Sequence, residues 1–136
     1  QLWSLQPQVV LSAALTDNRC GGLALETLPG TALERLDAVV LGPGLGSGPQ
    51  PPSQCTGWRQ LQAFPGLLLL DADGLNRLAQ GDASTWLQQR AGPTWLTPHR
   101  SEFDRLFPQW AGLPRGLLGP AASGGHRRRP PRCGRL

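Results

Sequence analysis

Three short apolar runs each end abruptly at a cluster of glycines, carboxylates or a histidine. The runs predict strands at residues 37–41, 67–70 and 94–97. Near-continuous apolar runs of about four to six residues are typical of parallel strands that are covered on both faces. Parallel strands point the same way, so their polar endings gather along one edge, where open α/β sheets bind ligands. The sequence therefore predicts one site built from three strand ends.

The segments between these runs predict helices. Trp58 and Leu61 lie three residues apart on one face of a helix that follows Ser53 and ends near Ala63. Further helices are expected at residues 74–79, at 84–90 and from 101 onward, and a weak strand is expected at 8–14. This alternation predicts the α/β class, with a mainly parallel sheet and right-handed crossovers.

Hydroxyl side chains predict where three of the turns and helices begin. Thr31 and Glu34 have the spacing of a capping box, which predicts a single turn before the first strand. Ser84 and Ser101 are the expected N-caps of the two later helices.

The first strand ends in the glycine loop Gly42-Pro43-Gly44-Leu45-Gly46. Glycines between a strand and a helix let backbone N–H groups approach a phosphate or another anion closely. The loop is not the dinucleotide fingerprint G-x-G-x-x-G, and it is not a phosphate-binding loop with a lysine, because the chain contains no lysine. A plain tight turn is the alternative, and the pentapeptide by itself does not decide between the two.

The second strand ends at Asp71 and Asp73, which flank one alanine. Residues two apart on an extended backbone point to the same side, so both carboxylates can face one ligand or Mg²⁺. Two like charges this close need a cation or hydrogen-bond donors to stay ionised together. Alternatively, Asp73 caps the helix expected from Gly74 while Asp71 faces the ligand. Leucines form the inner face of that helix, whereas Asn76 and Arg77 are expected to point elsewhere.

The third strand ends at His99, and Glu102 lies three residues further on. A single histidine is more often structural than catalytic, but its position beside the other two clusters favours a role in ligand binding. His126 lies among arginines near the end of the chain and receives no functional interpretation. The sequence contains no Ser-His-Asp order, H-E-x-x-H motif or zinc spacing, so no residue is assigned as a metal ligand.

The composition suits one soluble domain. The 136 residues are 39% hydrophobic, and no apolar stretch approaches the roughly 18 residues that span a bilayer. Three cysteines without C-x-x-C spacing favour reduced thiols and a cytoplasmic protein. They are Cys20, Cys55 and Cys133.

The net charge of +4 belongs to the end of the chain. Residues 116–136 contain five arginines, no acid and no helical or strand periodicity, and they follow a nearly neutral body at 1–115. Disorder or a slipped reading frame explains this tail better than nucleic-acid binding, because no aromatic residue is interleaved to stack on bases. The chain also lacks methionine, so we expect it to be a fragment of a longer product.

Taken together, the three clusters resemble the ADP/ATP-dependent NAD(P)H-hydrate dehydratases, which are ribokinase-like proteins often fused to an NAD(P)H-hydrate epimerase. The resemblance covers roughly residues 36–107. It implies a three-layer α/β/α ribokinase-like sandwich, incomplete here, and a lyase that repairs the hydrated cofactors NADHX and NADPHX. In that family ADP, or ATP in animals, phosphorylates the ring hydroxyl, loss of phosphate restores NADH or NADPH, and Mg²⁺ assists.

The resemblance also implies roles for individual residues and partners. Glu102 matches the acidic residue that the related vitamin kinases use near metal and phosphate. The intact enzyme is expected to be a cytoplasmic homo-oligomer without a membrane partner. Positions that match the substrate site are Gly42, Gly44, Gly46, Asp71, Asp73, Asn76 and His99. The family's lysine-glycine loop and its G-T-G-D segment with the general base do not occur here. We therefore expect a fragment that carries part of the substrate wall, has no identified catalytic residue and does not turn over.

Two other interpretations remain open from the sequence. A thiazole or pyrimidine vitamin kinase has the same fold, although His99 and the Asp71-Ala72-Asp73 segment differ from the strand endings of those kinases. A non-catalytic module with a nucleic-acid-binding arginine tail would instead show steeply salt-dependent binding that requires residues 116–136.

Overall fold

The computed structural model describes residues 15, 17, 22–46 and 48–113. The expected strand at 8–14 and the tail at 116–136 lie outside the described residues, as do Cys20, Cys133 and His126. The division of the chain into a body at 1–115 and a separate tail therefore stays a prediction.

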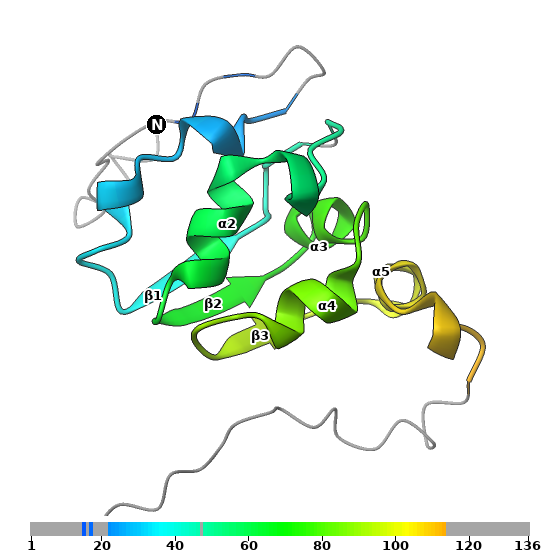
Figure 1. Cartoon of the computed structure of the whole chain (residues 1–136). Helices are drawn as coiled ribbons and strands as arrows, with labels where there is room; N and C mark the ends of the chain where they lie inside the picture. The colour runs from blue at the N-terminus through cyan, green and yellow to red at the C-terminus, as the bar shows by residue number, and fades with distance from the viewer. Residues whose placement is uncertain (1–14, 16, 18–21, 47, 114–136) are drawn as a thin grey trace, which may run out of the picture.

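Three parallel strands form the sheet, in the order β1 (Ala38–Leu41), β2 (Leu67–Leu70) and β3 (Thr94–Leu96) (Figure 1). Their bounds agree with the predicted runs to within one residue. The prediction of an α/β fold with a parallel sheet is confirmed. The helices are α2 (Thr56–Ala63), α3 (Asp73–Leu78), α4 (Ala83–Gln88) and α5 (Arg100–Leu106). Short 3₁₀ turns are η1 (Leu25–Thr27), η2 (Gly30–Ala32), η3 (Pro52–Gln54) and η4 (Pro108–Trp110).

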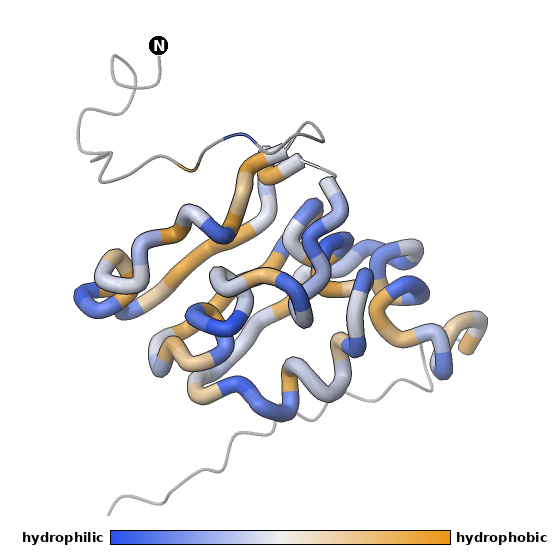
Figure 2. The backbone as a smooth tube through the Cα atoms, turned by 45° about the horizontal axis from the view of Figure 1, so that its top comes forward, coloured by the Kyte–Doolittle hydropathy of each residue, from blue (hydrophilic) through white to orange (hydrophobic). Residues whose placement is uncertain are grey.

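The hydrophobic core lies between one face of the sheet and the helices. Leu68 and Leu70 of β2 are fully buried in it, and Trp58 and Leu61 of α2 are buried as the helical spacing predicts. The indole of Trp58 meets that of Trp86 from α4 edge to face, with ring centroids 5.3 Å apart. Figure 2 shows the apolar stretches of the chain running through the sheet, with polar segments around them. Helices α2 and α4 thus cover the same face.

The opposite face of the sheet is apolar and uncovered. Val40, Leu69 and Trp95 are neighbours across the three strands, on the face away from the core. Val40 is 66% exposed and Trp95 is 62% exposed. The expectation that the strands are covered on both faces is therefore wrong for the described part of the chain, because no described helix packs over this row. Only one helical layer of the expected sandwich is present there.

The capping box predicted at Thr31 does not form. Turn η2 begins after Pro29, which makes no side-chain capping bond, and Thr31 lies inside the turn. The expected single turn before β1 is nevertheless present. Pro29, whose ring fixes its φ angle, occupies the position just before the turn. Thr31 lies two residues later, inside the turn, so its hydroxyl is not at the capping position.

Two further N-caps lie nearer the N-terminus than predicted. Asp82, not Ser84, caps α4, and its carboxylate accepts hydrogen bonds from the Thr85 N–H at 2.9 Å and the Thr85 hydroxyl at 2.7 Å. His99, not Ser101, caps α5. In both cases the predicted serine lies in the first turn of the helix, where its backbone is already helical.

Replacing Asp82 with alanine is expected to lower the urea midpoint of the chain at neutral pH. The hydrogen bonds from Thr85 favour the ionised carboxylate and hold the pKa of Asp82 below its ordinary value. This contribution is complete above the ordinary pKa of aspartate and is lost as the pH falls through the folded-state pKa. The difference between wild type and Asp82→Ala should therefore shrink in acid.

Ser84→Ala is the matched control, because Ser84 does not cap the helix. Urea titrations of all three proteins, followed by circular dichroism at neutral and acid pH, check this. An equal loss in Ser84→Ala and Asp82→Ala would contradict the assignment of the cap.

Candidate functional site

The glycine loop at residues 42–46 leaves β1 through backbone conformations that favour glycine. The φ angles of Gly42, Gly44 and Gly46 are +142°, +77° and +76°. The Leu45 N–H donates to the Gly42 carbonyl at 3.0 Å, and the Leu45 side chain is buried. The loop is therefore a tight turn anchored in the core, which accounts for the glycines without excluding a ligand.

Gly42 and Gly44 differ in what surrounds them. A Cβ added to Gly42 would lie 1.7 Å from the Asp71 carbonyl oxygen, because the ends of β1 and β2 approach closely there. A Cβ on Gly44 would meet nothing within 4 Å. The tip of the loop is thus open while its base is closed against the next strand.

The second cluster turns sharply at Ala72, between the two aspartates. Ala72 has φ +46° and ψ −120°, a conformation that costs a non-glycine residue on the order of 1–3 kcal/mol. The backbone is therefore not extended here, so the alternation of side chains along a strand does not apply to the two carboxylates. Asp71 Oδ1 accepts from the Ala72 N–H at 2.9 Å, while Asp73 Oδ2 accepts from the Gly46 N–H at 2.9 Å.

Asp73 therefore does not cap α3. The helix begins at Asp73, after Ala72, and shows no side-chain capping bond at that end. The carboxylate instead reaches across to the glycine loop, so the first and second clusters are in direct contact. Whether Asp71 and Asp73 also face a ligand stays a prediction.

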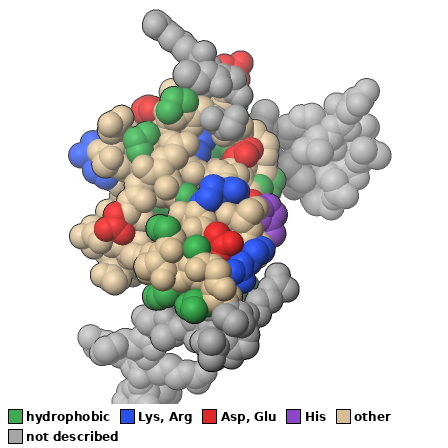
Figure 3. All heavy atoms as spheres, turned by 90° about the vertical axis from the view of Figure 1, so that its right-hand side faces the viewer, with side chains coloured by type: hydrophobic (Ala, Val, Ile, Leu, Met, Phe, Trp, Pro, Cys, Tyr) green, Lys and Arg blue, Asp and Glu red, His purple; other side chains and the backbone are tan. Residues whose placement is uncertain are grey.

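The third cluster is a reciprocal capping box. His99 Nδ1 accepts from the Glu102 N–H at 3.2 Å, and Glu102 Oε2 accepts from the His99 N–H at 3.0 Å. Nε2 of His99 also lies 3.5 Å from Glu102 Oε1. The His99 side chain is 65% exposed, whereas that of Glu102 is only 8% exposed. The imidazole is thus held by the helix yet open to a ligand, on a side of the molecule where acidic and basic side chains intermix (Figure 3).

The sheet brings the third cluster to the same edge as the other two. The Thr97 N–H donates to the Leu70 carbonyl at 3.2 Å, which aligns the ends of β2 and β3. Asn76 Oδ1 of α3 accepts from an Arg105 guanidinium nitrogen of α5 at 2.8 Å, so the helices behind these strand ends are also tied together. The predicted gathering of the clusters at one edge agrees with this arrangement.

Sequence reasoning missed Arg77, which was expected to point away from the core. Its side chain is fully buried, and loss of hydration lowers the pKa of its guanidinium from the ordinary arginine value. Arg77 lies between buried leucines in a six-residue helix. Its place between two leucines was the only sequence signal that Arg77 could be buried. That signal is weak, because arginine side chains are mostly solvent-exposed.

The described residues do not gather a ligand set for a metal ion. No group of three or more histidine, cysteine, aspartate or glutamate side chains in these parts of the chain could hold one. The carboxylates at the strand ends are engaged with backbone N–H groups instead. Because Mg²⁺ is usually held by one or two carboxylates together with water and substrate phosphates, its binding to this part of the chain stays a prediction.

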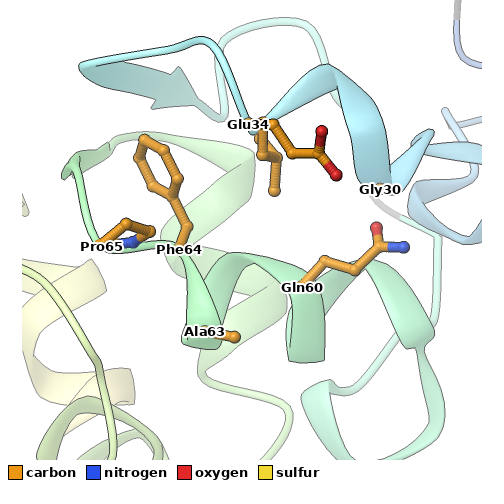
Figure 4. Close-up of a pocket in the computed structure, with 7 residues that line it drawn as sticks. Gly30, Glu34, Gln60, Ala63, Phe64 and Pro65 are labelled. Carbon is orange, nitrogen blue, oxygen red and sulfur yellow. The ribbon is translucent and has the colours of Figure 1, made fainter.

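A shallow pocket of about 250 Å³ lies elsewhere, beside the segments that lead into β1 and β2 (Figure 4). It is lined by Gly30, Leu33, Glu34, Gln60, Ala63, Phe64 and Pro65. None of the predicted site residues contributes to it. Because it lies towards the amino ends of the strands, it is separate from the candidate site.

A parallel sheet with loop clusters at the carboxyl ends of its strands defines an α/β protein. The chain belongs to the NAD(P)H-hydrate dehydratase family, whose family model matches residues 8–118. The sheet and this family match are consistent with an incomplete ribokinase-like fold. This membership favours the dehydratase interpretation over the vitamin-kinase one.

Curated relatives carry related names. The chain is 52% identical over 88 residues to the bifunctional NAD(P)H-hydrate repair enzyme of Gloeobacter violaceus. This match covers 65% of the chain and 16% of that protein. It is 43% identical over 99 residues to the bifunctional NAD(P)H-hydrate repair enzyme of Synechocystis, and the match covers 73% of the chain and 18% of that protein. An ATP-dependent (S)-NAD(P)H-hydrate dehydratase of Pediculus humanus is 40% identical to the chain over 75 residues, and the match covers 54% of the chain and 24% of that protein. The chain therefore spans less than a quarter of the length of each of these relatives.

None of the helices in the described residues is long and apolar enough to cross a membrane.

Proposed function

We propose that this chain provides part of the hydrate-binding wall of an ADP- or ATP-dependent NAD(P)H-hydrate dehydratase. The observation that carries the proposal is the contact between the first two clusters. The glycine loop is open at Gly44, packs at Gly42 against the Asp71 carbonyl, and is hydrogen-bonded from the Gly46 N–H to Asp73. The family model covers this whole region, at residues 8–118.

In this proposal the loop backbone at Gly44 lies against the hydrated nicotinamide ring, with Asp71, Asn76 and His99 around it. Glu102, which orients His99 through the capping box, lies toward the phosphates of the nucleotide. Phosphoryl transfer from ADP or ATP to the ring hydroxyl, followed by loss of phosphate, would regenerate NADH or NADPH. Mg²⁺ would assist by neutralising the phosphate charge, and we assign it no ligand among the described residues. The complete enzyme is proposed to be a cytoplasmic homo-oligomer.

Turnover requires groups that this chain does not supply. The sequence has no lysine-glycine loop and no G-T-G-D segment. We therefore expect the purified chain, given ADP, Mg²⁺ and NADHX, to produce no NADH above the uncatalysed rate. Detection of ADP-dependent conversion would contradict the assignment of an inactive substrate wall.

Substitution of Gly44 with asparagine tests the ligand wall. Asparagine tolerates positive φ better than other residues, and the space around Gly44 is open, so the fold should persist. The new side chain would occupy the proposed hydrate position. We expect calorimetric titration to show NADHX binding weakened about tenfold or more, which is a loss of roughly 1.4 kcal/mol.

Gly112→Asn provides the matched control. Gly112 has φ +84° and open space within 4 Å, but it lies after α5 and outside the predicted site. This variant should bind NADHX as the wild type does. Equal affinities in the Gly44 variant and the wild type would remove the loop from the site, and absence of NADHX binding by the wild type would refute the proposed function.

A further inference from the structure

Arg77 connects the short helix α3 to the backbone of the glycine loop. Its Nε donates to the Gly46 carbonyl at 3.0 Å, and its Nη2 donates to the Leu45 carbonyl at 2.5 Å. Nη1 donates to the Leu23 carbonyl at 2.7 Å and to Gln50 Oε1 at 2.6 Å. The guanidinium fork therefore holds two consecutive carbonyls of the loop and two acceptors from flanking segments at once.

The same helix also holds the loop through Asp73. The Gly46 N–H donates to Asp73 Oδ2, and the Gly46 carbonyl accepts from Arg77 Nε. Asp73 and Arg77 are four residues apart, so they lie on the same face of α3. One turn of α3 thus forms hydrogen bonds with both the N–H and the carbonyl of Gly46.

The burial of Arg77 makes this arrangement energetically important. The side chain is fully buried, and it forms no ion pair within the described ranges. A buried cation needs all its donors satisfied, because unmet ones carry a large desolvation cost. Here neutral oxygens accept from four of its five N–H groups, so the loop conformation and the burial of Arg77 depend on each other.

We infer that Arg77 is the positioning residue of the 42–46 loop, fixing the backbone that carries Gly44 at the proposed hydrate wall. The role in ligand binding rests on the proposed function, whereas the positioning of the loop does not. Arg77 does not itself reach the open tip, since its partners lie at the loop's base and flanks.

Arg77→Met tests the inference, because methionine fills similar space without donating to the carbonyls. Amide hydrogen exchange at Leu45 and Gly46, measured relative to the Leu68 amide in β2, should accelerate about tenfold or more, as expected when charge-assisted hydrogen bonds are lost. Affinity for NADHX, corrected for the folded fraction, should fall by about tenfold as well.

Arg90→Met is the matched control. Arg90 also donates to a set of backbone carbonyls, at Leu61, Gln62, Phe64 and Gly66, and burial likewise lowers the pKa of its guanidinium. Those carbonyls lie on the side that leads into β2, away from the glycine loop. This variant should lose global stability while keeping the wild-type exchange ratio at Gly46 and the wild-type affinity.

The outcomes separate the positioning role from a general loss of stability. An unchanged exchange ratio at Gly46 in Arg77→Met, or the same ratio change in Arg90→Met, would overturn the inference. If Arg77→Met does not fold, Arg77→Lys decides, since it keeps the charge but not the planar fork. Faster exchange at Gly46 in the lysine variant supports the inference, and an unchanged ratio overturns it. If the wild type does not bind NADHX, the proposed function fails while the exchange measurement still tests Arg77.

Discussion

Gly42→Ala is expected to destabilise the chain by at least about 4 kcal/mol, a size of effect reserved for severe structural conflicts. The new Cβ would lie 1.7 Å from the Asp71 carbonyl oxygen and 3.0 Å from the Gly74 nitrogen. Both atoms belong to the backbone, so no side-chain rotation relieves the overlap. The φ angle of +142° adds strain of its own. A domain of ordinary stability has only about 5–15 kcal/mol to lose, so we expect the urea midpoint to fall by roughly a quarter or more.

Gly44→Ala provides the comparison for this effect. It has a φ of +77° and no atom within 4 Å of the added Cβ, so only the backbone strain of about 1–2 kcal/mol applies. Urea titration followed by circular dichroism measures both variants. Similar losses would mean that strands β1 and β2 do not approach closely at Asp71, and the contact between the first two clusters would then be wrong.

The strands and the inner face of α2 were predictable because local signals agreed. The leucine run of β2 is preceded by Pro65 and Gly66, which end one element before the next begins. Trp58 and Leu61 share a helical face, and both are buried as expected. At these positions the apolar pattern and the turn residues indicate the same structure, so no distant contact is needed to decide it.

The N-caps were harder to predict because several polar residues compete at each helix start. Ser84 follows Asp82 closely, and Ser101 follows His99 closely, so either member of each pair has a side chain that can accept an N–H. The preceding turn decides which one is still outside the helix. That depends on how the chain leaves the sheet, which a local pattern does not contain.

The linkage inside the site could not be predicted from spacing at all. Gly46 and Asp73 are 27 residues apart, and their hydrogen bond depends on the sharp turn at Ala72. Arg77 reaches back to the backbone carbonyl of Leu23, 54 residues away. Neutral backbone carbonyls bind this arginine, and every residue has one, so sequence does not identify the partners.

Trp58→Ala is expected to cost about 3–5 kcal/mol, the usual loss for a large aromatic side chain in a core. Trp58 is fully buried, packs edge to face on Trp86, and donates its indole N–H to the Gln50 carbonyl at 3.2 Å. The substitution leaves a cavity and an unpaired buried carbonyl. Urea titration followed by circular dichroism checks the loss without depending on tryptophan fluorescence.

Trp95→Ala separates burial from residue type, because Trp95 is 62% exposed on the uncovered face of the sheet. Its loss should be about 1 kcal/mol or less, which is the range of strand propensity at an exposed position. If Trp95→Ala costs as much as Trp58→Ala, the row of Val40, Leu69 and Trp95 is buried in solution. The size of that loss should then depend on protein concentration if a second copy covers the row, and should be independent of it if the chain covers the row itself.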